Sequence, residues 1–316
     1  MTEQLTYHAT RQGYGEALLE LGAENPNVVV LDADLAKSTT SIAFKKHFPG
    51  RFFDCGIAEQ CMMAVAAGLA ASGKVCFTGS FAIFATGRAY EPVRNTIAYG
   101  QLNVKLCPTH AGISVGADGS SHQAIEDVTL MRAIPNMKVV VPADYVEAKM
   151  AVKAAAVTPG PVYIRLGRAP VADINDAATY KFEFGKALIL REGSDITIIA
   201  VGLMVQEALQ AAEALAKKGI SAEVINPRTV KPLDEKTILN SVRKTGRALT
   251  AECHTIVGGL GSAVSEILSQ YYPAPMAFVG VEDRFGQSGN PDELLKHYGL
   301  TAKDIEQKSL KLLGQF

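Results

Sequence analysis

The feature of this 316-residue chain that most restricts its fold is the alternation of short β-rich runs with longer alanine-rich segments of helical period. This pattern predicts parallel strands joined by crossover helices, and therefore an α/β fold. In the first two thirds we expect strands at Val28–Asp32, Arg51–Asp54, Lys74–Phe77, Asn103–Pro108, Lys138–Val141 and Val162–Arg165. The helices expected between them are Thr10–Leu21, Ala58–Ala71, Tyr90–Tyr99, Ala124–Ala133 and Tyr145–Ala156.

A second alternating series follows a polar, aperiodic segment at 171–186, which we interpret as a linker. Its expected strands are Asp195–Val201, Ser221–Asn226, Arg247–Glu252 and Met276–Gly280, and its expected helices are Gln206–Lys217, Asp234–Arg243 and Ser262–Gln270. The chain length also favours two domains over one. We place these domains at 1–170 and 187–316.

Composition excludes several classes of function. A formal net charge of -1 lacks the surplus of basic residues that nucleic acid or an anionic membrane surface requires. No run reaches the roughly 18 apolar residues of a membrane span, and the first residues do not resemble an export signal. The five cysteines are an odd number without CxxC spacing, which argues against disulfides and a structural zinc site. We therefore expect a cytoplasmic protein.

Polar and aromatic side chains concentrate where the strands of the first domain end. Ligands bind outside the carboxyl ends of parallel strands, so these positions are candidates for a site. They are Asp32–Asp34, Gly56–Glu59, Ser80–Phe84, the glycine-rich loop Thr109–His122, and Arg165 with Arg168.

Each candidate also has an ordinary structural explanation. Glu59 lies in the first turn of a helix, where the helix dipole favours a negative side chain, and Asp34 could cap a helix. Phe81 and Phe84 could be core residues, whereas a glycine-rich loop is an unusual place to pack His110 and His122. A functional site becomes the better interpretation because all of these residues share one edge of the sheet.

The runs FFDCGIAEQ (52–60), SFAIF (80–84), THAGISVGADGSSHQ (109–123) and IPNMKVVVPAD (134–144) resemble the pyrimidine-binding domain of transketolases, and the remainder resembles their C-terminal domain. The resemblance implies thiamine diphosphate as cofactor. By this resemblance Glu59 binds the pyrimidine nitrogen and favours the imino tautomer. Phe84 stacks on the ring, Phe81 lines its pocket, and Asp34 lies near the cofactor or the subunit seam. Gly87 stands where several transketolases have a third aromatic residue.

The resemblance also implies a site for sugar phosphates. His110 and His122 match histidines around the ketose, where an imidazole near its working pKa can pass protons. Asp118 matches an aspartate that holds a sugar hydroxyl. The positions that match phosphate-binding residues are Arg11, Ser38 and Arg168.

One half of the family's cofactor site is missing from the sequence. Transketolases bind the diphosphate through Mg²⁺ with a Gly-Asp-Gly and a downstream Asn, and no such pair occurs here. The resemblance therefore implies no metal ligands in this chain, an N-terminal transketolase subunit that binds Mg²⁺, and an α2β2 assembly. The expected function is the C-terminal subunit of a transketolase, inactive alone, which transfers a ketol unit between sugar phosphates.

Three alternatives stay open at this point. A 1-deoxyxylulose-5-phosphate synthase fragment shares the GIAEQ run, but that family has arginine where this chain has Thr109–His110. The β subunit of a 2-oxoacid dehydrogenase has a similar length but would not carry the GADGSSHQ loop. A non-catalytic assembly partner would have no need of Glu59 or the two histidines.

Two further strings receive no role. Gly258–Ser262 does not fit GxGxxG and is interpreted as a tight turn before a helix. The neighbours Glu252, Cys253 and His254 cannot all face one ion from a single strand.

Overall fold

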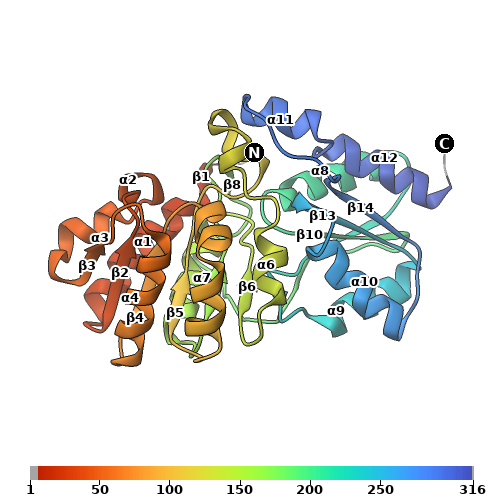
Figure 1. Cartoon of the computed structure of the whole chain (residues 1–316). Helices are drawn as coiled ribbons and strands as arrows, with labels where there is room; N and C mark the ends of the chain where they lie inside the picture. The colour runs from red at the N-terminus through yellow and green to blue at the C-terminus, as the bar shows by residue number, and fades with distance from the viewer. Residues whose placement is uncertain (1–5, 315–316) are drawn as a thin grey trace.

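The structure is a computed structural model that describes residues 6–314. Two α/β units lie side by side, with the N-terminal unit at the left of Figure 1 and the C-terminal unit at the right. The larger sheet has seven strands in the order β12-β6-β7-β5-β4-β2-β3. Its strands are β2 (Val28–Asp32), β3 (Phe52–Asp54), β4 (Val75–Gly79), β5 (Val104–Leu106), β6 (Lys138–Val140), β7 (Val162–Ile164) and β12 (Thr229–Lys231).

The second sheet has five strands in the order β14-β13-β10-β11-β9. They are β9 (Leu188–Arg191), β10 (Ile196–Ala200), β11 (Ala222–Asn226), β13 (Ala248–Thr255) and β14 (Met276–Val281). In both sheets all neighbours are parallel except one edge strand, β12 in the first and β9 in the second. A separate antiparallel pair joins β1 (Tyr7–Ala9) to β8 (Pro170–Ala172). The expected α/β fold is confirmed.

Helices cover both faces of the larger sheet because its strands are buried on both sides. In β2, Val28 and Val30 belong to the core cluster that includes residues of α1 (Thr10–Glu24) and α7 (Tyr145–Val157), while Val29 and Leu31 belong to the cluster on the other face, which includes residues of α4 (Glu59–Ala71) and α6 (Asp127–Ala133). This alternation is the two-residue period of a strand. Such strands read as continuous apolar runs, which is why the sequence predicts them well.

The contact between α1 and α7 depends on a glycine. A Cβ atom at Gly13 would lie 2.4 Å from the carbonyl oxygen of Tyr145. The two helices run side by side in Figure 1, and they can approach closely here because Gly13 has no side chain.

All ten expected strands are present, but one expected helix has the wrong type. The segment predicted as a helix over Tyr90–Tyr99 is a short α5 (Tyr90–Pro92) followed by a π-helix, η3 (Val93–Ala98). A second π-helix, η2 (Phe84–Arg88), precedes them. Wide π-turns are typical of functional sites, and they place the side chains after Phe84 differently from an α-helix.

The C-terminal unit adds helices on both faces of its sheet. They are α8 (Met204–Ala216), α9 (Glu235–Thr245), α10 (Leu260–Tyr271), α11 (Pro291–His297) and α12 (Ala302–Leu313). Two short helices of the first unit, α2 (Ala36–Thr39) and α3 (Ile42–His47), complete the described helices of α type. Within residues 6–314, none of the helices combines the length and apolar character needed to cross a membrane.

The segment at 171–186 is held on the surface of the first unit. The Asp144 carboxylate accepts hydrogen bonds from the backbone N–H groups of Ile174 and Asn175, at 2.9 and 2.8 Å. The Tyr180 hydroxyl donates to the buried Glu147 carboxylate at 2.9 Å, and Phe182 is buried in the core beside α7. The expected linker is therefore a strap with fixed contacts.

Candidate active site

The candidate site lies beyond the carboxyl ends of β3, β2, β4, β5 and β7, which are neighbours in the larger sheet. Parallel strands all point the same way, so the segments that follow them meet at one edge. Two isolated bridges tighten this edge, one of them between Phe81 and Thr109. Residues from distant parts of the sequence are thereby brought together.

Glu59 is the first residue of α4, and its side chain is only 1% exposed. The Arg88 guanidinium donates to its Oε2 atom at 2.9 Å, and the Ser80 hydroxyl lies 3.4 Å from Oε1. A buried carboxylate is costly unless it is paired, and Arg88 supplies the opposite charge. The sequence analysis did not identify Arg88. The sequence feature that could have identified Arg88 is its place as a basic residue four positions after Phe84, next to a pocket in which the Glu59 carboxyl group needs a partner.

Four aromatic rings cluster beside this carboxylate. Phe81 stacks on His110, with ring centres 3.9 Å apart, and lies nearly parallel to Phe84 at 6.0 Å. His122 meets Phe84 edge-on at 5.3 Å and Phe81 at 6.0 Å. The structure therefore brings together the two phenylalanines and the two histidines named from the sequence, on two different loops.

His110 has a strained backbone, with φ of 59°, and its side chain is buried. Its Nδ1 atom shares a 2.7 Å hydrogen bond with the Thr109 hydroxyl. Burial, and then the positive charges of Arg11 and Arg168, lower the pKa of His110 to about 3. With so low a pKa the His110 ring is neutral at neutral pH and holds a single N–H proton, so a role for His110 in proton transfer stays a prediction. The ring remains able to donate or accept hydrogen bonds.

The three positions expected to bind phosphate come from separate segments and lie near one another. The Arg11 guanidinium donates to the Ser38 carbonyl oxygen at 2.6 Å, and Arg168 donates to the Val115 carbonyl oxygen at 2.5 Å. Burial, and then the charge of Arg168, lower the pKa of Arg11 from its usual value. Two guanidinium groups that share one region form a favourable place for an anion.

The remaining expected positions lie at the rim. Asp34 is exposed, has φ of 61° and donates its backbone N–H to Asp54. It does not cap the following helix, because the N-cap residue of α2 is Leu35. Asp118 is exposed at the end of the turn Ile113–Asp118. Gly87 is exposed in η2, and a Cβ atom there would meet only Ile83, at 3.9 Å.

The loop that carries Asp118 and His122 is held by a residue that the sequence analysis did not single out. Gln123 is buried, and its Nε2 atom lies within 3.4 Å of the carbonyl oxygens of Ile113, Gly116 and Gln287. The last of these belongs to the C-terminal unit. Gln123 therefore links the loop to both units of the chain.

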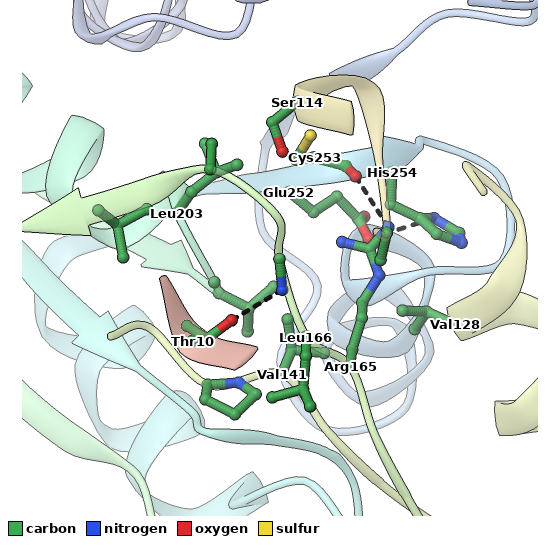
Figure 2. A pocket seen from close by; sticks show the side chains of 17 residues that line it. Thr10, Ser114, Val128, Val141, Arg165, Leu166, Leu203, Glu252, Cys253 and His254 are labelled. Carbon is green, nitrogen blue, oxygen red and sulfur yellow. Dashed lines mark hydrogen bonds and ion pairs between the residues drawn. The ribbon is translucent and has the colours of Figure 1, made fainter. Parts of the chain in front are cut away.

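A buried ion pair supports the same loop from beneath. Arg165, at the end of β7, makes two hydrogen bonds to Asp127 at 2.7 and 3.0 Å and also donates to the Ala124 and Cys253 carbonyl oxygens. Figure 2 shows the Arg165 side chain extending from β7 toward Cys253 in β13. Burial alone would raise the pKa of Asp127, but the charge and hydrogen bonds of Arg165 outweigh burial and hold that pKa below its usual value.

The cavity in Figure 2 lies between the two units and is lined by Thr10, Ser114, Arg165 and Glu252, among others. Its volume of about 40 Å³ has room for only a few water molecules. The Glu252 carboxylate accepts the N–H groups of Leu260 and Gly261, both at 2.8 Å, at the start of α10. Of the string Gly258–Ser262, the two glycines Gly258 and Gly259 lie in the turn between β13 and α10, and residues 260–262 are the first turn of α10 itself.

The family models match the two units separately. The model of the transketolase pyrimidine-binding domain matches residues 7–172, and that of the transketolase C-terminal domain matches residues 185–305. Because these two matches cover most of the chain, and the fold has the same two units, the chain belongs to the transketolase family.

Within that family the chain is similar to two separate proteins over nearly their whole length. A solved structure described as a split-gene transketolase, an inactive β4 tetramer, is 52% identical, with a TM-score of 0.90 and coverage of 97% of this chain and 98% of that chain. A Methanocaldococcus jannaschii protein, provisionally named transketolase C-terminal section, is 49% identical over 96% of each chain. Human transketolase is 41% identical, but the chain spans only 48% of it.

Proposed function

We propose that this chain is the C-terminal subunit of a transketolase, which transfers a two-carbon ketol unit from a ketose phosphate to an aldose phosphate with thiamine diphosphate. The observation that carries the proposal is the meeting of a buried carboxylate, two phenylalanines and two histidines at one edge of the sheet, beside two arginines. The carboxylate and the phenylalanines suit an aminopyrimidine, and the histidines and the arginines suit a sugar phosphate.

The residues present fit the pyrimidine end of the cofactor. When bound, thiamine diphosphate supplies the carbanion that attacks the ketose carbonyl. Glu59 would hydrogen-bond the ring nitrogen, Phe84 would stack on the ring and Phe81 would line its pocket. The Oε1 atom of Glu59 supports this fit, because its described partner, the Ser80 hydroxyl, is as distant as 3.4 Å. That oxygen can accept a further hydrogen bond.

The histidines would act on the sugar in two different ways. His110 is neutral, so it would position a hydroxyl by hydrogen bonding, with Thr109 setting the orientation of its ring. His122 would pass the proton as the C–C bond breaks or forms, because it lies beside Phe84 on a solvent-accessible loop. Asp118 would hold a further hydroxyl, and Asp34 would face the cofactor or the subunit seam.

Arg11, Ser38 and Arg168 would bind the phosphate of the substrate. The guanidinium of Arg11 has an Nε–H without a hydrogen-bond partner among residues 6–314. A phosphate oxygen would satisfy this donor, and the second arginine would add charge from the opposite segment.

A partner chain would supply the rest of the active site. The sequence lacks the Gly-Asp-Gly and downstream Asn that hold the diphosphate through Mg²⁺ in this family. We therefore assign Mg²⁺ to an N-terminal subunit and propose an α2β2 assembly. The similarity to a separate transketolase C-terminal section, and to a Clostridium 6-deoxy-6-sulfo-D-fructose transketolase subunit that is 46% identical, supports this division.

The test is reconstitution with a chain that carries the Gly-Asp-Gly half. Ketol transfer between sugar phosphates should require both chains, thiamine diphosphate and Mg²⁺. In the mixture, Glu59→Gln should lower turnover by at least about 100-fold, the usual scale of one proton-transfer group, while partner association persists. Glu192→Gln, at an exposed carboxylate of the C-terminal unit, is the matched control.

Two results would contradict the proposal. One is turnover of pyruvate without turnover of a ketose phosphate, as a deoxyxylulose-phosphate synthase or 2-oxoacid dehydrogenase would show. The other is undiminished activity of the Glu59→Gln mixture. No turnover of any substrate, with stable association of the two chains, would favour a non-catalytic partner.

A further inference from the structure

Arg88 reaches from the surface into the pocket that the proposed function assigns to the aminopyrimidine. Its side chain is 49% exposed, whereas that of Glu59 is 1% exposed. The guanidinium makes two contacts there: a hydrogen bond to Glu59 Oε2 at 2.9 Å, and a cation–π contact in which Cζ lies 4.5 Å from the centre of the Phe84 ring.

These two contacts have a clear physical cause. Among residues 6–314, Arg88 is the cation that lies within ion-pair distance of Glu59. A carboxylate with 1% exposure would pay a large desolvation cost without such a partner. The planar guanidinium also suits an aromatic face, where a lysine ammonium could not stack.

The proposed function, on which this inference rests, gives the same two side chains to the cofactor. The aminopyrimidine is a planar group that would hydrogen-bond Glu59 and stack on Phe84. The guanidinium is a planar group that already does both. The other described neighbours of the Phe84 ring are Phe81 and His122, so its surroundings are crowded.

We propose that the Arg88 guanidinium and the aminopyrimidine ring exclude each other, so that Arg88 must leave Glu59 and Phe84 before the cofactor binds. The way out is open, because Arg88 ends the π-helix η2 and half of its side chain already contacts solvent. Its described side-chain hydrogen bond is the one to Glu59. Leaving therefore breaks one ion pair and one cation–π contact.

A different arrangement makes the opposite prediction. If Arg88 stayed on Oε2 while the ring used Oε1, Arg88 would be a lasting support for the Glu59 carboxylate. Removing it would then weaken the binding of the cofactor. If the guanidinium and the ring exclude each other, removing Arg88 strengthens the binding of the cofactor, because the free chain no longer has to release the guanidinium.

The experiment compares Arg88→Ala with the unmodified chain in the reconstituted two-chain complex with Mg²⁺. Calorimetry measures the Kd of thiamine diphosphate, which is independent of turnover. We expect the variant to bind about three- to tenfold more tightly, the equivalent of one partly exposed ion pair with a ring contact. Arg94→Ala, at an exposed arginine of the adjacent π-helix whose described side-chain bond is to Asn95, should leave the Kd unchanged.

A second measurement tests the ion pair in the chain alone. Arg88→Ala should lower the midpoint of thermal unfolding, because Glu59 loses its partner, and the double variant Glu59→Gln/Arg88→Ala should recover most of that loss. An equal or higher Kd for Arg88→Ala would overturn the competition and leave the proposed function standing. Failure of both the unmodified complex and the variant to bind thiamine diphosphate would overturn the proposed function and this inference with it.

Discussion

Removal of the Asp127 carboxylate should be among the most destabilising single changes in this chain. Asp127 is fully buried and Arg165 is 8% exposed, so Asp127→Ala leaves a guanidinium without its counter-charge in the interior. Breaking a buried pair in this way costs about 3–5 kcal/mol. The Tyr163 hydroxyl, which donates to the same carboxylate at 2.5 Å, loses its acceptor and adds about 1 kcal/mol.

This loss is a large share of the free energy of unfolding of an ordinary protein, about 5–15 kcal/mol. Urea-induced unfolding at pH 7, followed by circular dichroism, measures it directly. The double variant Asp127→Leu/Arg165→Met removes both charges and should cost less than the sum of the single variants. Because the pKa of Asp127 lies below its usual value, the contribution of the pair is present at neutral pH and is lost only as the pH falls through that lowered pKa.

The reasoning about Asp127 would be refuted by either of two results. One is a loss below about 1 kcal/mol for Asp127→Ala, which is the scale of an exposed ion pair. The other is a double variant whose cost equals the sum of the two single costs, since the pair would then contribute no coupling.

Three further changes test other contacts. Burial raises the pKa of Glu147 to about 7, so its folded form holds a proton that the unfolded form releases, and the free energy of unfolding should fall by up to about 3 kcal/mol between pH 4.5 and pH 7. Glu147→Gln should remove that slope in urea unfolding. Asp144→Ala loses the N-cap of α7 and the bonds to the strap at 171–186, so unfolding should become about 2–4 kcal/mol easier by the same assay. Gln123→Met keeps the length of the side chain but loses its amide, and in the reconstituted enzyme it should raise the KM for the ketose phosphate about five- to tenfold with a smaller change in kcat.

Each of these predictions has a contrary outcome. An unchanged pH slope in Glu147→Gln would show that other groups set the pH dependence. An Asp144→Ala variant as stable as the parent would mean that the strap contributes little to the fold. A fall in kcat at constant KM for Gln123→Met would indicate an effect on chemistry instead of on the substrate loop.

The central strands and their order of alternation with helices were predictable because their signal is local. A strand buried on both faces is a short apolar run, and β2, with five buried residues, is readable without knowledge of its neighbours. Strands β1, β8, β9 and β12 were missed. They are three or four residues long and exist because an antiparallel neighbour is present, as β6 is for β12.

Helix α12 was missed although its signal was in the sequence. Thr301 and Asp304 form a capping box at its start, in the spacing that marks a helix N-terminus. The π-helices, in contrast, could not be predicted from the sequence. An α-turn and a π-turn have similar local sequence preferences, and the packing of neighbouring segments decides between them.

The sequence by itself determined the fold class, the candidate edge of the sheet and the residues at its loops, since these follow from hydrophobic period and from where polar residues interrupt it. Only the tertiary structure decided what each side chain touches. It placed Arg88 on Glu59, lowered the pKa of His110 by burial beside Arg11, and tied the substrate loop to the C-terminal unit through Gln123. The first of these contacts joins residues 29 positions apart and the last joins residues 164 positions apart, and local patterns do not encode such distances.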